Sequence, residues 1–415
     1  MFIILRLKKM NKIAAVDLRF LLLAAMLVFL PGVEALKNIF AFLFVLSWVL
    51  VSKKNNNWGG KWQIIDTILL LWILADIFVS INAVITHQLP GSNFRDVIRF
   101  VLIAWVLSRI YFSKEKLNIL ALISVVATVI TLAYSYYSTG GTLKELHSVG
   151  HINHTAIFLL IAYAISLSLL LFEFNNLKKY QKIILFLTTI TLFYATIDTN
   201  SRAAFGLINV VTLINFIYLV IRLRKFYFAV IFSGFVFIIG FIFWNNPPLA
   251  LERMMEKEHI LYDSARVKIN NFSYYAFKEN PILGIGFGNY GQLENGDIQD
   301  SVIRDQGVFD SSQFIASSHA HNVYFNYLVS GGILIFSIFL WFWAYIAWII
   351  MRLFFLPSSE KWIILSSISV FLINLIIGLF NTTLHHEHAI LSMFVLGLLI
   401  SRYRLALYSN NFHQN

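Results

Sequence analysis

Two histidines and an asparagine open one strongly apolar segment, and their side chains are suited to proton transfer and hydrogen bonding. His319, His321 and Asn322 stand in the stretch SSHAHNVYFNYLVSGG, which runs from Ser317 to Gly332. The imidazole pKa lies near neutrality, so histidine is well suited to take or give a proton there. The pattern predicts a general base or a polar binding group where an apolar helix begins.

Four arginines are candidates for binding an anionic group. Arg202 lies in DTNSRAAF and Arg266 in DSARVKINNF, while Arg95 and Arg99 stand one helical turn apart. A guanidinium can hold a phosphate with two hydrogen bonds, and like charges one turn apart repel unless an anion meets them. The alternatives are a snorkelling side chain at a helix end for Arg202 and a solvated surface charge for Arg266.

Further histidines lie in two short polar stretches, HSVGHINHTA and HHEHA. Neither stretch has the H-E-x-x-H spacing of a helical zinc site, and the pair in HAH alone is a weak ligand set. We therefore expect no metal and favour proton transfer or hydrogen bonding. These histidines are His147, His151 and His154, then His385, His386 and His388.

The elements that must position these residues are membrane-spanning helices. Of the 415 residues, 59% are hydrophobic and only 13% are charged, whereas soluble domains carry about a quarter charged residues. The chain contains no cysteine, which excludes disulfides and thiol chemistry. The predicted fold class is an all-α integral membrane protein.

Twelve apolar stretches are candidates for transmembrane helices, since a crossing needs about 20 residues. They lie at 18–31, 35–52, 63–86, 95–112, 117–138, 152–173, 183–198, 203–221, 226–244, 320–351, 362–381 and 389–406. The first follows a basic stretch, and we expect an uncleaved helix rather than a signal peptide. The chain then divides into residues 1–244 with nine spans, a long loop over 245–319, and residues 320–415 with three spans and a short tail.

Lysine and arginine side chains lie mainly in one set of connections. The positive-inside rule places these connections and both termini in the cytoplasm. The net charge of +11 is therefore a signal of topology and not a nucleic-acid-binding patch. The long loop, whose acids outnumber its bases, then lies outside with the histidines and arginines named above.

Two short helices are predicted in the long loop, over LALERMMEKEH and SARVKINNFSYYAFKEN, and in the second Ile269, Phe272 and Ala276 share a face. GFGNYG, residues 286–291, matches the G-x-G-x-x-G of dinucleotide sites but lacks their strand and helix context. We expect its glycines to shape a turn that lets the backbone approach a partner closely.

The candidate residues together predict a site at the outer membrane boundary, with arginines for negative charge and a histidine for proton transfer. A substrate with a lipid tail and a phosphorylated head suits such a site. The rival class is a secondary transporter or lipid flippase. Transporters place polar groups at the midplane and often contain internal repeats, which this sequence lacks.

SSHAHNVYFNYLVSGG resembles the signature of the O-antigen ligase and polymerase superfamily, in which a His-Asn pair is followed after nine residues by glycine. His321, Asn322 and Gly332 fit the pattern, and the further glycine three residues on is absent. The segments around Arg266 and Arg202 are similar to the loop and the short Ser-Arg-Ala element of the superfamily. The resemblance covers most of the chain, including the twelve-span layout.

The resemblance implies a glycosyltransferase of the bacterial inner membrane that acts at the periplasmic face without a cofactor. Its partners would be membrane lipids and a glycan donor on undecaprenyl diphosphate. The acceptor would be a lipid A core sugar in ligases, a carrier-linked repeat in polymerases, or a Ser or Thr hydroxyl in protein oligosaccharyltransferases. We favour the ligase, because protein glycosylators usually have a longer C-terminal part and polymerases match the histidine signature more weakly.

The resemblance also implies a role for each residue. His321 takes the proton of the acceptor hydroxyl as the hydroxyl attacks the anomeric carbon with inversion. Arg202 and Arg266 hold the diphosphate and stabilise the charge that develops as it leaves. Further expected substrate-binding residues are Asn322, His319, His154, Arg95 and Arg99.

Overall fold

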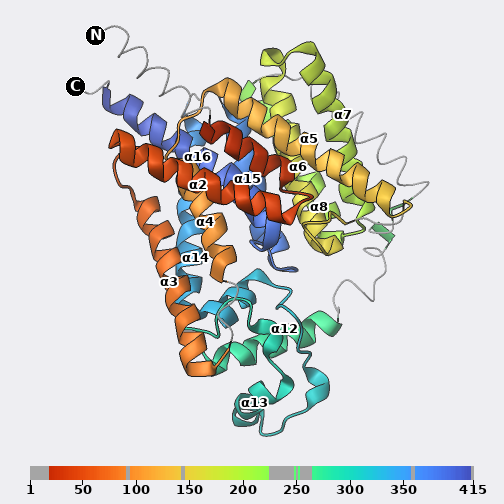
Figure 1. The fold of residues 1–415 in the computed structure, drawn as a ribbon. Helices are drawn as coiled ribbons and strands as arrows, with labels where there is room; N and C mark the ends of the chain where they lie inside the picture. Colours follow the sequence, from red (N-terminus) through yellow and green to blue (C-terminus); the bar gives the residue numbers. More distant parts are fainter. Residues whose placement is uncertain are drawn as a thin grey trace.

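The computed structural model describes residues 18–89, 94–141, 145–223, 247–248, 251–252, 264–356 and 360–412. Within these ranges the regular elements are helices, as the composition predicts (Figure 1). The first is Leu18–Phe29. The others are α2 (Glu34–Asn55), α3 (Ile64–His87), α4 (Phe94–Ser108), α5 (Lys114–Ser138), α6 (Ile152–Glu173), α7 (Lys179–Asp198), α8 (Arg202–Leu223), α12 (Ser264–Glu279), α13 (Gln299–Gln306), α14 (Val323–Phe355), α15 (Lys361–Leu372) with the π-helix η5 (Ile373–Ile377), and α16 (His386–Phe412).

Eight helices in the described ranges are long and apolar enough to cross a membrane, namely α2, α3, α5, α6, α7, α8, α14 and α16. The chain is therefore a multi-pass membrane protein. Leu18–Phe29, α4 and the α15–η5 pair are shorter. The expected span 226–244 and most of the LALERMMEKEH helix lie outside the described residues, so the count of twelve spans stays a prediction.

The two ends of the helix bundle differ in charge. At one end, Asp66 of α3 is buried between Arg109 and Arg404, each with an Nη2 atom 2.7 Å from Asp66 Oδ1. Lys114, the first residue of α5, pairs with Glu173, the last residue of α6, with 2.9 Å between Nζ and Oε2. We call this end the basic end. Helices α12 and α13 lie at the opposite end, which we call the α12 end (Figure 1).

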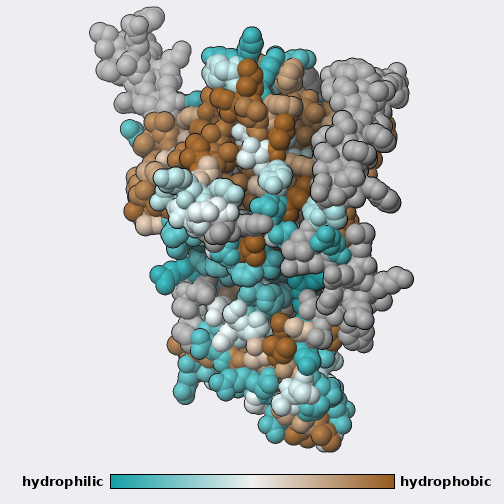
Figure 2. All heavy atoms as spheres, turned by 90° about the vertical axis from the view of Figure 1, so that its right-hand side faces the viewer, coloured by the Kyte–Doolittle hydropathy of each residue, from teal (hydrophilic) through white to brown (hydrophobic). Residues whose placement is uncertain are grey.

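The surface follows the same division. On the face in Figure 2, hydrophobic side chains cover much of the bundle, a hydrophilic band lies beneath them, and the part with α12 and α13 is mixed. Such an apolar belt above a polar band is typical of a helix bundle that meets lipid and then water. The band marks the level at which the candidate site is expected.

Helix α14 corresponds to the span predicted at 320–351, and it is interrupted inside. Gly332 has φ 60° and ψ −168° inside it. The rings of Tyr324 and Tyr327 lie 6.1 and 4.4 Å from that of Phe339, although in a continuous helix the residues would be roughly 22 and 18 Å apart. Residues 323–331 therefore form a short leg that folds back beside the long leg, residues 333–355.

Backbone of the long loop caps the turn between the two legs. Four backbone hydrogen bonds of 2.8–3.2 Å join the loop to the two legs. The N–H groups of Ile285 and Gly286 donate to the carbonyls of Val329 and Ser330, and those of Ile333 and Leu334 donate to the carbonyls of Pro281 and Ile282. A Cβ on Gly332 would lie 2.2 Å from the carbonyl oxygen of Ile282, so only glycine fits. Within GFGNYG, Gly286 has a φ of 86° and bonds Ser330, but the close approach to the backbone of the short leg is made by Gly284, just before this stretch, where a Cβ would lie 2.5 Å from the carbonyl oxygen of Val329.

Candidate functional site

Asn322 begins the short leg of α14 as its N-cap. Its Oδ1 accepts bonds from the backbone N–H groups of Tyr324 at 2.9 Å and Phe325 at 3.2 Å, and its Nδ2 donates to the carbonyl of Leu379 at 3.3 Å. These bonds satisfy N–H groups that a helix start leaves without intrahelical partners. The nine-residue spacing of the sequence signature is thus the length of the short leg, about 13 Å.

Seven histidines meet where the short leg begins. His154, in the first turn of α6, has its ring centroid 5.2–6.3 Å from the centroids of five others. Its neighbours are His151, His319, His385, His386 and His388. The ring of His321 lies 4.1 Å from that of His319. The three histidine stretches of the sequence therefore converge on His154, and we call the seven residues the histidine cluster.

Two members of the histidine cluster have a left-handed backbone. The φ angle is 48° at His321 and 49° at His386. Such a conformation costs a non-glycine residue on the order of 1–3 kcal/mol, and it persists where the surrounding structure imposes it, often at functional sites. His386 is the first residue of α16, and His321 directly precedes the cap Asn322, so two helix starts fix the directions of these side chains.

The start of α4, which lies beside the histidine cluster, is recessed from the end of the bundle. The rings of Trp72 in α3 and Phe100 in α4 are 5.9 Å apart. Helix α3 continues to His87, while α4 begins at Phe94. At 1.5 Å per residue, α3 extends roughly 13 Å beyond the start of α4, about the length of the short leg. His321, which precedes the short leg, therefore lies about one leg length inward from the turn at the α12 end.

A buried ion pair lies beside the cluster. Lys37 of α2 pairs with Glu387 of α16, and both side chains are almost fully buried. The hydroxyl of Ser148 lies 3.0 Å from Lys37 Nζ and 3.2 Å from Glu387 Oε1. The pair fixes the start of α16, and with it the two histidines that flank Glu387.

Arg99 acts electrostatically on two histidines of the cluster, His385 and His386. Arg99 lies 3.1 Å from Asp96 Oδ1 and donates to Asn38 Oδ1 at 2.5 Å. Asp96 and Arg99 both act electrostatically on His386. The side chain of Arg95 is exposed at the start of α4. The spacing of Arg95 and Arg99 predicted an anionic partner, and for Arg99 that partner is Asp96.

Two histidines outside the helices have lowered pKa values. Burial, followed by the nearby His321, lowers the pKa of His319 to about 4. Burial, with His386 and His154 adding to it, lowers the pKa of His385 well below its ordinary value. Both imidazoles are therefore neutral at pH 7, and each then has one ring nitrogen that donates a hydrogen bond and one that accepts.

Arg202 lies level with His154 on a neighbouring helix. Helices α6 and α8 pack together and run in the same direction, because Tyr163 bonds Thr212 at 2.7 Å and Ser168 bonds Asn215 at 2.9 Å. Counting back ten residues from the first pair places Arg202 beside residue 153. The structure thus brings Arg202 to the level of the cluster, at the start of α8 and half-buried.

Arg266 is held by a separate packed unit at the α12 end. It stands half-buried in the first turn of α12, the helix predicted here, and the face shared by Ile269, Phe272 and Ala276 is buried. The same apolar core includes Ala320, the residue between His319 and His321. The helix of Arg266 therefore packs against the segment that leads into the histidine cluster.

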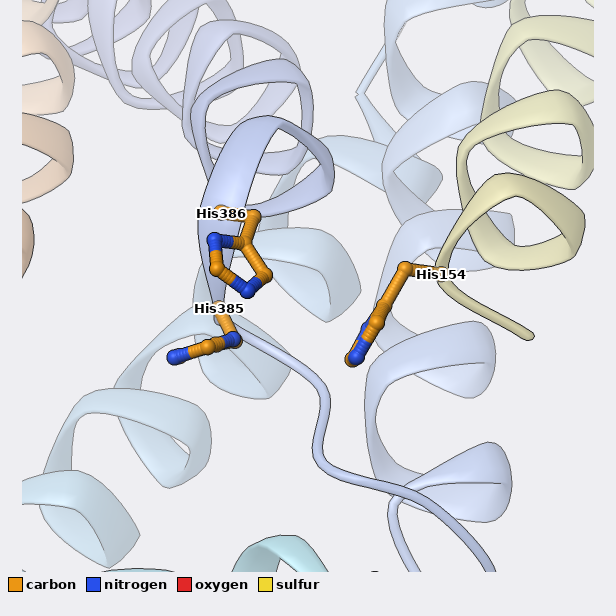
Figure 3. Close-up of side chains that lie close together, drawn as sticks. All are labelled: His154, His385 and His386. Carbon is orange, nitrogen blue, oxygen red and sulfur yellow. The ribbon is translucent and has the colours of Figure 1, made fainter. Parts of the chain in front are cut away.

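Three of the histidines lie close enough together to share a metal ion. One ring nitrogen from each of His154, His385 and His386 lies within 4.8 Å of the other two (Figure 3). His154 comes from α6, and the other two stand at the start of α16. The sequence predicts no metal and does not mark His385 or His386 as site residues, because ligands from two distant segments form no motif. The only signal was the polar stretch HHEHA in an apolar region.

A comparison with protein-family models gives one match, the O-antigen ligase model, over residues 187–340. This segment belongs to the O-antigen ligase and polymerase superfamily. It contains Arg202, Arg266 and the whole signature from His321 to Gly332, so the predicted resemblance is confirmed. The match does not distinguish ligases from polymerases. None of the curated proteins compared with the chain matches it.

Proposed function

We propose that the chain is an O-antigen ligase of the bacterial inner membrane. It would transfer a glycan from undecaprenyl diphosphate to a lipid A core sugar at the periplasmic face. The observation that carries this proposal is the position of His321, a residue of the family-matched segment, which directly precedes the short leg of α14 and has its ring 4.1 Å from that of His319 in the histidine cluster. A superfamily signature and a group of proton-accepting side chains thus coincide.

In the proposed reaction the imidazole of His321 accepts the proton of the acceptor hydroxyl. The hydroxyl oxygen forms a bond to the anomeric carbon, and the bond from that carbon to the diphosphate oxygen breaks. The electron pair leaves on the diphosphate, and direct displacement inverts the anomeric centre. His319, whose ring centroid lies 4.1 Å from that of His321, is neutral, because burial lowers its pKa to about 4.

Arginine residues would stabilise the diphosphate as it leaves. The proposed role of Arg202 is supported by its position level with His154. The proposed role of Arg266 is supported by the packing of α12 against the segment of His319 and His321. Arg99 would add positive charge to the same region, although Asp96 already offsets part of it. A diphosphate is a good leaving group, so the reaction needs no strong general acid.

An apolar surface is available for the carrier lipid. The part of α3 that extends beyond the start of α4 has exposed apolar side chains, including Phe78, Ile81 and Ile85 with 53, 53 and 75% exposure. A polyprenyl chain could lie along this surface with its diphosphate near the cluster. This arrangement favours a lipid-linked donor over a water-soluble one.

The test is the lipopolysaccharide of a strain from which the gene is deleted. A ligase predicts loss of O-antigen from lipid A core while carrier-linked polymer still accumulates, and complementation should restore attachment. Core carrying a single repeat would instead identify a polymerase. Normal lipopolysaccharide with loss of protein glycans would identify a protein oligosaccharyltransferase, and either result would contradict the ligase proposal.

A further inference from the structure

We propose that His154, His385 and His386 bind one divalent transition-metal ion of the zinc type. One ring nitrogen from each lies within 4.8 Å of the other two. Zinc-bound imidazole nitrogens lie about 2.0–2.1 Å from the ion, which sets neighbouring nitrogens at roughly 3.4 Å in a tetrahedron. The three rings would close on the ion by about 1 Å, which small side-chain rotations allow.

The positions of the three side chains favour a shared ligand. His154 faces His385 and His386 across the space between the starts of α6 and α16 (Figure 3). His386 is the first residue of α16 and keeps its strained φ of 49°. Neighbouring residues on one element normally point apart, and this backbone brings the rings of His385 and His386 to 3.7 Å between centroids.

The hydrogen-bonding state of the rings points to the same conclusion. His154 is 5% exposed, and Nδ1 of both His154 and His385 is buried without a hydrogen-bond partner among the described residues. Buried polar nitrogens are almost always satisfied by a partner. An ion between the rings would satisfy them, whereas three neutral imidazoles alone do not.

His388 supports the site without joining it. It is fully buried, stacks on His154 with 5.2 Å between centroids, and its Nε2 accepts the backbone N–H of His385 at 3.4 Å. That bond occupies Nε2 of His388, which is not one of the three histidines whose ring nitrogens lie together. With His154, His385 and His386 as its protein ligands, a tetrahedral ion would keep one open position, the arrangement of sites that bind water or a substrate oxygen.

The surrounding charges and ligand types define the ion. Lys37 is paired with Glu387 and Arg99 with Asp96, so positive and negative side chains offset one another near the site. Imidazole ligands suit zinc, copper, iron or nickel, whereas magnesium and calcium require oxygen ligands. The proposal therefore predicts binding of Zn²⁺ and no binding of Mg²⁺ at this position.

The experiment measures binding and is independent of glycan transfer. Full-length protein without a polyhistidine tag is purified in detergent, stripped with a chelator, and titrated with Zn²⁺, with Mg²⁺ as the control ion. Co²⁺ provides a second readout, because tetrahedral coordination gives visible absorption bands. We expect one tight Zn²⁺ per chain in the wild type and in His147→Ala, a substitution of an exposed histidine in the connection before α6.

Removal of a ligand should weaken binding by more than the 10–100-fold typical of losing an outer-shell partner. This is expected for His386→Ala and for His154→Ala, and Co²⁺ absorption should be lost in both. If the buried His154 variant does not fold, His386→Ala and the wild-type Co²⁺ spectrum still decide the matter. Unchanged Zn²⁺ affinity in His386→Ala, or equal binding of Mg²⁺, would overturn the proposal.

Discussion

At the scale of single residues, His321 and His319 are distinguished by their surroundings. His319 is held neutral by burial and by its neighbours. His321 lies next to the N-cap of the short leg, in a strained backbone conformation that fixes where its ring points. His321 is therefore the proposed base, and His319 is a neutral neighbour.

Substitution of His321 by alanine should remove the proposed base. General base catalysis contributes about 10²–10⁴-fold to a rate, so transfer should fall by at least 100-fold. The measurement is glycan transfer by membranes that contain equal amounts of protein. His147→Ala is the matched control and should retain full activity, while substantial transfer by His321→Ala would remove this residue from the mechanism.

Arg202→Lys separates phosphate binding from membrane anchoring. Lysine keeps the charge but loses the planar fork that binds a phosphate with two hydrogen bonds. We expect a roughly tenfold or larger fall in transfer, about 1.4 kcal/mol, with little change in membrane insertion. Wild-type transfer by this variant would identify Arg202 as a snorkelling side chain at the start of α8.

At the scale of elements, the broken helix α14 determines where the signature acts. Asn322 caps the short leg, Gly332 ends it, and backbone of residues 281–286 covers the turn. The residues of the sequence signature therefore specify where the short leg begins, how long it is and where the chain turns back. Its glycine is required by geometry rather than by chemistry.

Gly332→Ala should destabilise the protein, because its Cβ would meet backbone 2.2 Å away and its φ is 60°. We expect a loss of at least about 2 kcal/mol, seen as a lower thermal midpoint in detergent. Gly206→Ala in α8 is the control, since its Cβ would have nothing within 4 Å. Equal midpoints for the two variants would contradict the turn described here.

The contact between α12 and the segment 290–292 is sensitive to alkaline pH. The Tyr290 hydroxyl is buried 2.7 Å from Ser273 Oγ, and burial raises its pKa from 10 to about 12. The fold favours the neutral phenol, so this stabilisation is complete below pH 10 and is lost as the pH rises toward 12. Thermal midpoints should fall more steeply over this range in the wild type than in Tyr290→Phe, and parallel curves would rule the effect out.

At the scale of the whole molecule, contacts between distant parts of the chain assemble the site. The Lys37–Glu387 pair joins α2 to α16, and Ser148 adds the connection before α6. At the basic end, Asp66 joins α3 to α4 and α16 through Arg109 and Arg404. These ion pairs fix α16, whose start carries His386 and His388, relative to α2 and α3.

Lys37→Met should leave Glu387 as an unpaired buried charge and destabilise the protein by roughly 3–5 kcal/mol. The double variant Lys37→Met/Glu387→Gln should recover most of that loss in thermal unfolding. Lys278→Met is the control, because its partner Asp305 and the lysine itself are about one-third exposed, and exposed pairs contribute about 1 kcal/mol or less. Failure of the double variant to recover would mean that the pair has no such role.

The sequence by itself determined the membrane class and the superfamily, and it located most of the helices in the described residues, because hydrophobic length, charge distribution and a short motif are local properties. It also identified Asn322, Gly332 and the glycines of GFGNYG as special positions. The tertiary structure alone decided that α14 folds back, that Arg99 pairs with Asp96, and that seven histidines from three connections form one cluster around His154. Proximity between residues far apart in the chain depends on how the helices pack, and no local pattern records it.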